Sequence, residues 1–493
     1  MNALEIRNLS SCLLCADAPC TKACDKLNKP DKTIRSLRFN NYLGAISHIN
    51  DSCINCDAKC EKSCVLSSSV KIKEIMLGCI KQKENFKKEI KKADISTDFC
   101  GIKIENPFLL SSSVVASNYE MVSRAFDAGW AGAAFKTISL IDIHEASPRF
   151  SALKNLDGSF LAFKNIEQLS DHSVIENVEI FKKLKQNYPN KFLLVSIMGR
   201  NDEEWAYLAK ISEEAGADAL ELNFSCPNMT EEHSGSDIGQ VPELVKRYTK
   251  IVKDAVKIPV VAKLTPNVLS VVPAALAAKE GNADGVALIN TIKSITELNA
   301  VKNVYLGKNA RENFSIGGLS GSAVKPIALR FISEISANKD LKDLYISGMG
   351  GIYNFEDALM FLALGASSVQ ITTAVMEYGY RIIDDLKEGL ELFLGTFGAK
   401  SIKELKGFNM ENLKDVTERK RDIAILPKFI RSNCVGCGRC YISCMDGGHQ
   451  AISFKDRKPI LNPNNCVGCH LCILVCPNEA ITPSDVILDK SKK

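Results

Sequence analysis

The sequence predicts an α/β protein with a (β/α)8 barrel flanked by two cysteine-rich segments. At 493 residues the chain is too long for a single hydrophobic core. Across residues 93–400, short apolar runs alternate with amphipathic stretches, which is typical of parallel strands alternating with helices. Of the 19 cysteines, all but three fall in two clusters, residues 12–64 and 434–476. We therefore expect a barrel domain between two thiol-rich domains.

Composition argues against nucleic acid and membrane as partners. The net charge is +4, and neither lysine nor arginine gathers into a stripe. No apolar run reaches the length of a membrane span, and residues 1–9 lack the apolar core of a signal peptide. We expect a cytoplasmic protein. Because disulfides are not expected in a reducing cytosol, clustered thiols indicate metal binding.

The N-terminal cysteines form two groups of four within residues 1–92. The first has the spacing C-x2-C-x4-C-x3-C and comprises Cys12, Cys15, Cys20 and Cys24. The second has the spacing C-x2-C-x3-C-x3-C and comprises Cys53, Cys56, Cys60 and Cys64. Eight thiolates are the number that two [4Fe–4S] clusters need. Zinc is the alternative, but zinc sites combine two pairs rather than groups of four. Residues 71–92 are rich in lysine and glutamate and predict a solvated helix or a linker.

Eight candidate strands lie in the central segment, separated by helical stretches such as 118–128, 203–215, 241–255 and 355–364. An open doubly wound sheet would give the same alternation, but eight units in some 300 residues favour the closed barrel. The strands are expected at 107–115, 131–138, 192–198, 219–224, 259–264, 285–290, 344–347 and 368–372.

Polar residues follow seven of these strands. The carboxyl ends of barrel strands meet at one face, where catalytic residues lie. A lysine at a strand end is usually a solvated charge and a glycine pair is usually a turn, but their recurrence at one face favours a site. The glycines after the seventh strand, a second glycine-rich loop at 317–321 and the threonines after the eighth predict a phosphate site. Lys136 and Lys263 could face an anionic flavin ring.

The segment Glu221–Asn228 carries the strongest catalytic signal. Cys226 follows the fourth strand and is a candidate proton donor or acceptor. Asn223 and Ser225 could hold a small polar substrate by hydrogen bonds. The alternative is that Cys226 is a small buried hydrophobic residue, as free cysteines often are.

The C-terminal segment, residues 428–493, follows a polar linker at 401–427 and repeats the spacing C-x2-C-x2-C-x3-C. This is the signature of a ferredoxin with two [4Fe–4S] clusters, in which the fourth cysteine of each run binds the other cluster. One cluster is therefore assigned to Cys434, Cys437, Cys440 and Cys476. The other is assigned to Cys466, Cys469, Cys472 and Cys444.

From about residue 98 to its end, the chain resembles the dihydropyrimidine dehydrogenase family, specifically its pyrimidine-reducing FMN and iron–sulfur part. The dihydroorotate dehydrogenases share the barrel. Cys12–Cys24 resembles the amino-terminal cluster domain of the single-chain enzymes, whereas the second cysteine group departs from the family spacing. The stretches that carry the resemblance are Asn106–Phe108, Phe135–Thr137, Ser147–Phe150, Lys164–Glu167, Asn223–Pro227, Ala262–Asn267, Ile289–Thr291 and Cys434–Gln450.

This resemblance implies a role for many barrel residues. Cys226 would be the acid/base, and substrate would be contacted by Asn165, Asn223, Ser225, Asn290 and Thr291. FMN would be held by Ser111, Ser113, Lys136, Thr137, Lys263, Gly318, Gly348, Gly350, Gly351, Thr372 and Thr373.

The implied activity is the reduction of the C=C bond of uracil or thymine, or its reversal, in an oligomeric enzyme. No G-x-G-x-x-G segment lies between a strand and a helix, so electrons would come from a separate FAD/NAD(P)H reductase subunit through the iron–sulfur clusters. A dihydroorotate dehydrogenase is one alternative. A flavin and iron–sulfur electron-transfer subunit without pyrimidine turnover is the other.

Overall fold

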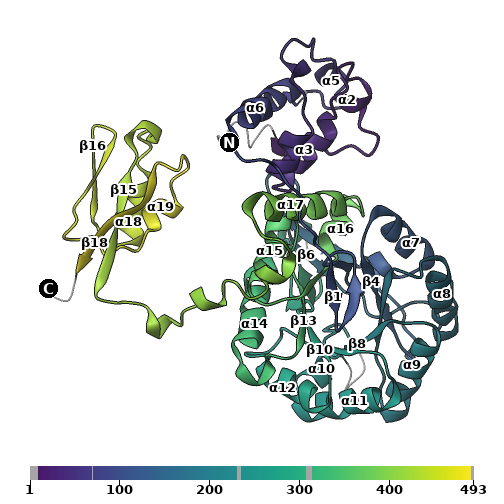
Figure 1. The fold of residues 1–493 in the computed structure, drawn as a ribbon. Helices are drawn as coiled ribbons and strands as arrows, with labels where there is room; N and C mark the ends of the chain where they lie inside the picture. The colour runs from purple at the N-terminus through teal and green to yellow at the C-terminus, as the bar shows by residue number, and fades with distance from the viewer. Residues whose placement is uncertain (1–8, 69, 230–234, 307–313, 490–493) are drawn as a thin grey trace. The chain divides into compact units, whose positions relative to one another are not determined.

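The structure is a computed structural model that describes residues 9–68, 70–229, 235–306 and 314–489. The chain separates into two compact units (Figure 1). The larger comprises Leu13–Met410, and the smaller centres on Glu411–Lys493. No helix in the described ranges is long and apolar enough to cross a membrane.

Eight parallel strands close into a barrel in the order β10-β13-β14-β3-β4-β7-β8-β9, which confirms the predicted fold class. All eight candidate strands are barrel strands, although the first ends at Leu110, five residues earlier than predicted. Their side chains are buried along the whole length of most strands, because helices cover the outside and side chains fill the inside. The strands are β3 (Phe108–Leu110), β4 (Gly132–Ile138), β7 (Phe192–Ile197), β8 (Ala219–Asn223), β9 (Val260–Lys263), β10 (Gly285–Leu288), β13 (Tyr345–Met349) and β14 (Ser368–Ile371).

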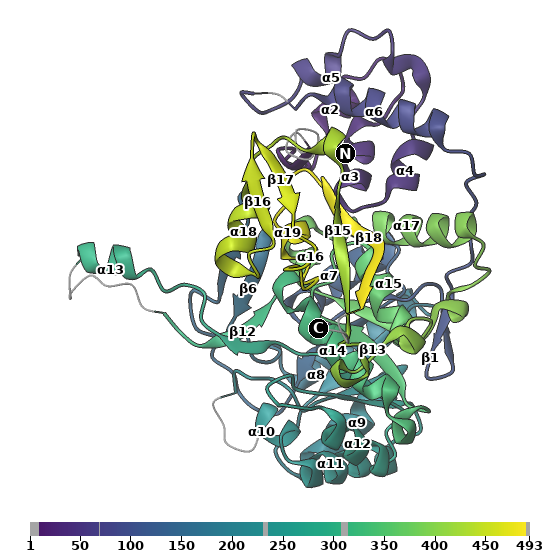
Figure 2. The ribbon, with the colours of Figure 1, turned by 90° about the vertical axis from the view of Figure 1, so that its left-hand side faces the viewer.

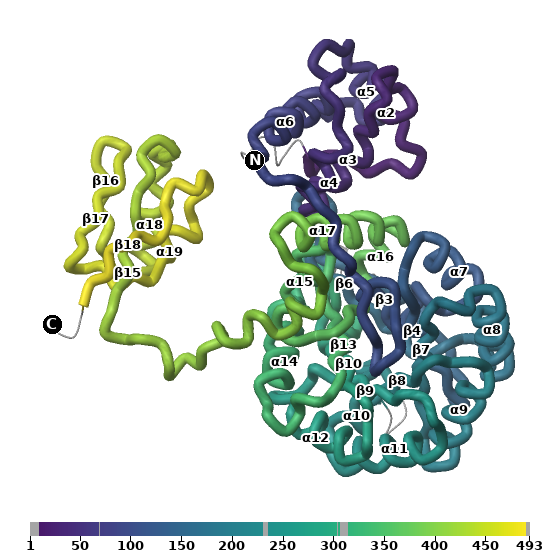
Figure 3. Tube along the Cα trace, in the orientation of Figure 1, coloured from purple at the N-terminus to yellow at the C-terminus, as the bar shows by residue number. Residues whose placement is uncertain are grey.

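Amphipathic helices surround the barrel (Figure 3). Side-chain caps begin several of them: Asn118 accepts a hydrogen bond from Met121 N, and Asn354 forms a capping box with Asp357. The helices are α7 (Tyr119–Ala128), α8 (Val174–Asn187), α9 (Asp202–Glu214), α11 (Pro242–Ala255), α12 (Val272–Glu280), α14 (Lys325–Ala337), α15 (Phe355–Ala363) and α17 (Ile382–Phe397).

A short hairpin, β1 (Thr97–Phe99) and β2 (Ile102–Ile104), supplies an aromatic side chain to the barrel core. Phe99 is fully buried, and its ring centroid lies 4.5 Å from that of Phe192 and 4.6 Å from that of Tyr345. These two residues begin β7 and β13, so Phe99 closes the amino-terminal end of the barrel. The polar residues that line the cavity described below gather at the opposite end.

A four-stranded antiparallel sheet borders the carboxyl ends of the barrel strands. Its order is β11 (Ile292–Ser294), β12 (Gly317–Ser320), β6 (Phe160–Asn165) and β5 (Phe150–Lys154). Figure 2 shows α13 (Ala300–Leu306), in the connection between β11 and β12, projecting away from the barrel. The prediction that residues 317–321 form a glycine-rich loop was wrong, because Gly317 and Gly318 are strand residues. They are glycines since a Cβ atom would lie 2.7 Å from Asn165 O at Gly317 and 2.1 Å from Thr291 Oγ1 at Gly318.

The N-terminal domain is helical. It contains α2 (Pro19–Lys22), α3 (Pro30–Arg38), α4 (Tyr42–Ser47), α5 (Lys59–Lys62) and α6 (Ile72–Asn85). The prediction of a solvated helix or linker at 71–92 was wrong for α6, whose Ile72, Met76, Cys79 and Ile80 are buried. Ile72, Met76 and Ile80 recur every four positions, and Cys79 lies three positions after Met76, so all four share one helix face. The lysine- and glutamate-rich composition of residues 71–92 obscured this face in the sequence.

Helix α17 of the barrel anchors this domain. Asp385 is buried and accepts hydrogen bonds from Arg35 Nε at 2.5 Å and Ser36 Oγ at 2.8 Å. One turn later, Glu388 accepts from Asn41 Nδ2 at 2.9 Å and contacts His48 Nε2. Just before α17, the Arg381 guanidinium donates to the carbonyl oxygens of Leu14 and Cys15.

Residues 411–489 of the smaller unit contain two antiparallel ribbons and two α-helices. β15 (Ile423–Phe429) pairs with β18 (Ile481–Asp489), and β16 (Ile452–Lys455) pairs with β17 (Lys458–Leu461). α18 (Arg439–Gly447) and α19 (Leu471–Leu474) each begin after a residue in the left-handed region, Gly438 and His470. The two cysteine runs are therefore presented in the same local conformation.

Replacing Asp385 with alanine should lower the free energy of unfolding by about 3 kcal/mol, because it leaves the largely buried Arg35 guanidinium with only the more exposed Asp384 as a counter-charge and removes the acceptor of the Ser36 hydroxyl. Urea denaturation of the two proteins measures the difference. Asp384→Ala is the matched control: Asp384 also pairs with Arg35 but is mostly exposed, so its loss should cost less than about 1 kcal/mol. Equal effects of the two substitutions would contradict the buried anchor.

Candidate functional site

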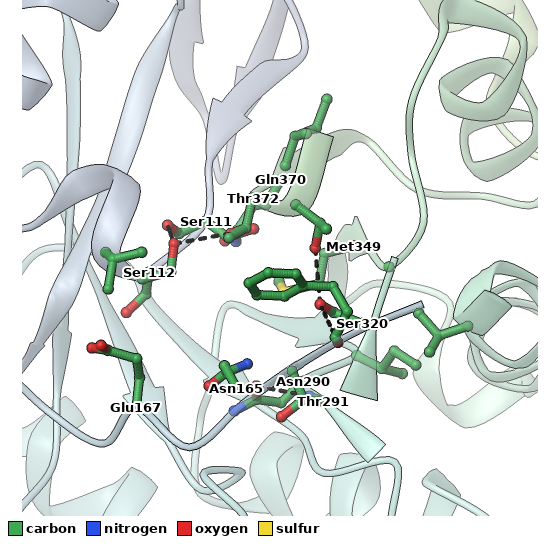
Figure 4. A pocket seen from close by; sticks show the side chains of 18 of the residues that line it. Ser111, Ser112, Asn165, Glu167, Asn290, Thr291, Ser320, Met349, Gln370 and Thr372 are labelled. Atoms are coloured by element: carbon green, nitrogen blue, oxygen red, sulfur yellow. Dashed lines mark hydrogen bonds between the residues drawn. The ribbon is translucent and has the colours of Figure 1, made fainter. Parts of the chain in front are cut away.

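A cavity opens at the carboxyl ends of the barrel strands. In Figure 4, Asn165, Asn290 and Thr291 gather on one side of it, and Ser111 and Thr372 lie on another. Fourteen of the residues predicted from the sequence line it: Ser111, Ser113, Lys136, Thr137, Asn165, Asn223, Cys226, Lys263, Asn290, Thr291, Gly350, Gly351, Thr372 and Thr373.

Three predicted residues lie behind this lining. Ser225 is fully buried, and its hydroxyl donates to Asn223 Oδ1 and accepts from Asn290 Nδ2, both at 2.9 Å. It therefore fixes two carboxamides that do line the cavity. Gly348 faces the helix layer, where its Cβ would lie 2.6 Å from the Phe361 ring. Gly318 lets Thr291 approach its backbone closely.

The carboxamides at the cavity have defined orientations. Asn223 donates from Nδ2 to Thr137 Oγ1 at 2.9 Å, and Asn290 accepts a hydrogen bond at Oδ1 from Thr291 N at 2.8 Å. Asn165 donates to Gly318 O at 3.3 Å. Each amide thus keeps hydrogen-bonding capacity for a molecule in the cavity, because an Asn side chain offers two donors and two acceptor lone pairs.

The thiol of Cys226 is buried at the cavity wall, just after β8. Burial raises the pKa of Cys226 to about 11, although Lys263 and the backbone N–H of Asn228 act in the opposite direction. At neutral pH the group is therefore a protonated thiol. Cys226 is a small buried residue, as the alternative reading held, and it also faces the cavity.

Sequence reasoning missed Glu167 as a cavity residue. It follows β6 in the bordering sheet rather than a barrel strand, so the strand-end rule did not point to it. Its carboxylate accepts from Lys136 Nζ at 2.7 Å and from Arg149 Nη1 at 2.9 Å. Lys136 is consequently a buried, paired cation and not a solvated one.

A second buried ion pair forms part of the cavity wall. Lys263 Nζ lies 3.1 Å from Glu221 Oε1, and Gln370 Nε2 donates to Glu221 Oε2 at 3.1 Å. Gln370 lines the cavity, and its Oε1 is buried without a hydrogen-bond partner in the described part of the chain. Glu221 and Gln370 lie within strands whose other residues are mostly apolar, and no pattern in the sequence separated them from core positions.

The phosphate side predicted for the cavity consists of glycines and hydroxyls. Gly350 and Gly351 have φ angles of 121° and 76°, which favour glycine and let consecutive backbone N–H groups turn toward an anion. Thr372 pairs with Ser113 at 3.0 Å, and Thr373 pairs with Ser320 at 2.9 Å. Together with the unpartnered amide oxygen of Gln370, this set fits a molecule that carries both a phosphate and a polar ring.

In the smaller unit, the cysteines line two cavities. Cys434, Cys437, Cys440 and Cys476 line one of them. Cys444, Cys466, Cys469 and Cys472 line the other. The fourth cysteine of each run thus lies with the first three of the other run. The sulfur atoms of Cys444 and Cys476 accept backbone hydrogen bonds from Ala451 and Ala480, each at 3.3 Å.

In the N-terminal domain, Cys24 of the first group acts electrostatically on cysteines of the second group. Burial raises the pKa of Cys53 to about 11, and Cys56 and Cys24 raise it further. Burial likewise raises the pKa of Cys60 to about 12, again with contributions from Cys24 and Cys56. Within the described ranges, no three His, Cys, Asp or Glu side chains converge on a single-ion position.

Comparisons with known proteins match both parts of this geometry. A family model described as dihydroorotate dehydrogenase matches residues 94–394, and one described as a 4Fe-4S dicluster domain matches residues 428–482. Neither range includes the N-terminal cysteine groups.

Three relatives extend the comparison. The NAD-dependent dihydropyrimidine dehydrogenase subunit PreA of Escherichia coli is 47% identical over 81% of this chain and 98% of its own. The chloroplastic dihydropyrimidine dehydrogenase (NADP+) of Arabidopsis thaliana is 32% identical over 67% of this chain and 80% of its own. The catalytic subunit of dihydroorotate dehydrogenase B (NAD+) of Pyrococcus furiosus is 37% identical over 64% of this chain and 98% of its own.

Alkylation of Cys226 by iodoacetamide should accelerate about tenfold per pH unit up to about pH 11, because the thiolate is the reactive form and burial holds the proton on the sulfur. Mass spectrometry of the Cys226 peptide between pH 7 and pH 11 measures the rate. The same peptide in urea-unfolded protein is the control and should level off near pH ~8.5. A plateau below pH 9 in the folded protein would contradict the raised pKa.

Proposed function

The chain belongs to the dihydropyrimidine dehydrogenase family, whose barrel the dihydroorotate dehydrogenases share, and on this premise we propose that it reduces the ring C=C bond of uracil or thymine to the 5,6-dihydropyrimidine, or catalyses the reverse. The observation that carries the proposal is the juxtaposition of the Cys226 thiol with the carboxamides of Asn165, Asn223 and Asn290 in one cavity.

The cavity suits FMN. Gly350, Gly351, Ser113, Thr372 and Thr373 would hold its phosphate through backbone N–H groups and hydroxyls. The rest of FMN would lie against Ser111, Lys136, Thr137 and Lys263. The unpartnered Oε1 of Gln370 offers an acceptor for an N–H group of the flavin ring. When bound, FMN would supply hydride chemistry and couple one-electron carriers to a two-electron reduction.

The substrate side suits a neutral pyrimidine. Uracil and thymine present alternating N–H and C=O groups, which carboxamides can match with both donors and acceptors. Asn165, Asn223, Asn290 and Thr291 would make these contacts, with Ser225 holding two of the amides in place. The two lysines among the described lining residues, Lys136 and Lys263, are already paired with carboxylates. This pairing disfavours a substrate that brings a carboxylate of its own, such as dihydroorotate.

Cys226 would act as the general acid in the reductive direction. Its raised pKa keeps the proton on sulfur at neutral pH, so that the proton is available for the ring carbon next to the one that receives hydride. Because the pKa of the thiol is raised to about 11, its contribution as a general acid is present throughout the neutral range and is lost as the pH rises through that value. Burial at the cavity wall also keeps bulk water from competing for the proton.

Iron–sulfur clusters would carry electrons to the barrel. The two four-cysteine cavities of the smaller unit support one [4Fe–4S] cluster each, and the eight N-terminal cysteines support two more. The E. coli relative is named as a subunit, which supports a partner protein that carries FAD and oxidises NAD(P)H. We further propose an oligomeric, cytoplasmic enzyme.

Dihydroorotate dehydrogenase activity is the second candidate, because the P. furiosus relative has that activity in its name. An electron-transfer subunit without pyrimidine turnover is a third. A steady-state comparison of uracil, thymine and dihydroorotate with a chemical reductant or oxidant separates them. We expect turnover of uracil or thymine at least tenfold above dihydroorotate. Faster turnover of dihydroorotate would establish the second candidate, and no turnover of any of them the third.

Replacing Cys226 with alanine should slow pyrimidine reduction by about 10²–10⁴-fold while flavin remains bound, because it removes the proton donor and leaves the phosphate side intact. Steady-state kinetics and flavin absorbance measure the two quantities. Cys100→Ala is the matched control, since Cys100 lies in the turn between β1 and β2 and does not line the cavity. A Cys226→Ala enzyme with the activity of the control would reject the role.

A further inference from the structure

Two segments of the N-terminal domain repeat one motif. Asp17–Cys24 and Asp57–Cys64 both read D-A-x-C-x-K-x-C. In each, the alanine lies in the left-handed region, with φ of 46° at Ala18 and 51° at Ala58. A one-turn helix follows each alanine, α2 in the first segment and α5 in the second, and the two helices pack together. The domain therefore presents its two cysteine groups through one local structure used twice.

Packing of α2 against α5 places the end of the first segment beside the second segment. Cys24 ends the first segment, and its charge acts on the buried thiols Cys53 and Cys60. In the smaller unit the fourth cysteine of each run, Cys444 or Cys476, lines a cavity together with the other run. By the same pattern, we group Cys24 with Cys53, Cys56 and Cys60.

Asn28 contacts this group directly. Its side chain is buried at 2% exposure, and its Nδ2 lies 3.2 Å from Cys53 Sγ. The amide orientation is fixed chemically, because Asn28 Oδ1 accepts the backbone N–H of Asn50 at 3.0 Å and a backbone N–H can only donate. The amide NH₂ group must therefore face the sulfur, with Asn50 Oδ1 and Ser52 Oγ as its other neighbours.

We propose that Asn28 is a positioning residue that raises the reduction potential of an iron–sulfur cluster held by Cys24, Cys53, Cys56 and Cys60. The inference rests on the proposed N-terminal clusters. An N–H donor to a ligating thiolate stabilises negative charge on the sulfur, and the reduced cluster carries one electron more than the oxidised one. The hydrogen bond therefore favours reduction. In the smaller unit backbone N–H groups contact Cys444 and Cys476, and a backbone donor cannot be removed by replacing a side chain. At Cys53 the donor is a side chain, so substitution can test its effect.

The test is an anaerobic redox titration of the full-length protein, followed by electron paramagnetic resonance, with iron content measured on the same samples. In Asn28→Leu, the midpoint potential of one transition should fall by about 59 mV, which corresponds to a tenfold change in the one-electron equilibrium constant. Asn28→Asp keeps the size of the side chain but has no amide donor, and it should move the same transition in the same direction. The remaining transitions serve as internal references and should not move.

Asn41→Leu is the matched control. Asn41 is a buried asparagine of the same domain, and its amide contacts Gly44 N and Glu388 in place of a thiol. It should leave all potentials unchanged. If both Asn28 variants hold full iron and shift nothing, the inference is overturned and the proposed clusters stand. If the native protein lacks iron for an N-terminal pair of clusters, the inference and that part of the proposed function fall together.

Discussion

The ion pair between Lys263 and Glu221 holds two charges inside a barrel that is otherwise mostly apolar. They lie on neighbouring strands, β9 and β8, and both are almost completely shielded from solvent. Either charge alone would carry a desolvation penalty of several kcal/mol. Glu221 accepts hydrogen bonds from both the Lys263 ammonium and the Gln370 amide. These contacts replace hydration, so the Lys263 ammonium can be buried at the cavity wall. The polar residues at the carboxyl end of the barrel lie above these three side chains.

The barrel was predictable because its strands bury both faces and read as continuous apolar runs, and the polar residues after them marked the functional face. Most of the predicted residues around Cys226 therefore line one cavity. The predictions that failed concern contacts that are determined only by three-dimensional packing. Ser225 alternates away from the cavity to support Asn223 and Asn290, and residues 317–318 pair as a strand because glycine lets two backbones approach. Glu167 follows β6, a strand whose long-range antiparallel pairing leaves no local signature in the sequence.

The two thiol-rich domains differ in how much of the cysteine grouping could be predicted from spacing alone. In the C-terminal runs the regular C-x2-C-x2-C-x3-C spacing specified the exchange of Cys444 and Cys476 before any geometry was known. In the N-terminal domain the unequal spacings gave no such assignment, and the approach of Cys24 to the second group emerges only from the packing of α2 against α5. The buried face of helix α6 was missed because lysine and glutamate dominate the composition of residues 71–92.

Arg381 gives the N-terminal domain a fixed relation to the barrel. Its guanidinium donates to the carbonyl groups of Leu14 and Cys15. Thr373, which lines the cavity, begins the short helix α16 (Thr373–Tyr378), which ends shortly before Arg381. A helix of six residues is about 9 Å long. Cys15 and the cavity are therefore connected through folded structure within one compact unit, so the separation of this thiol from the cavity is a property of the fold and not of a flexible linker.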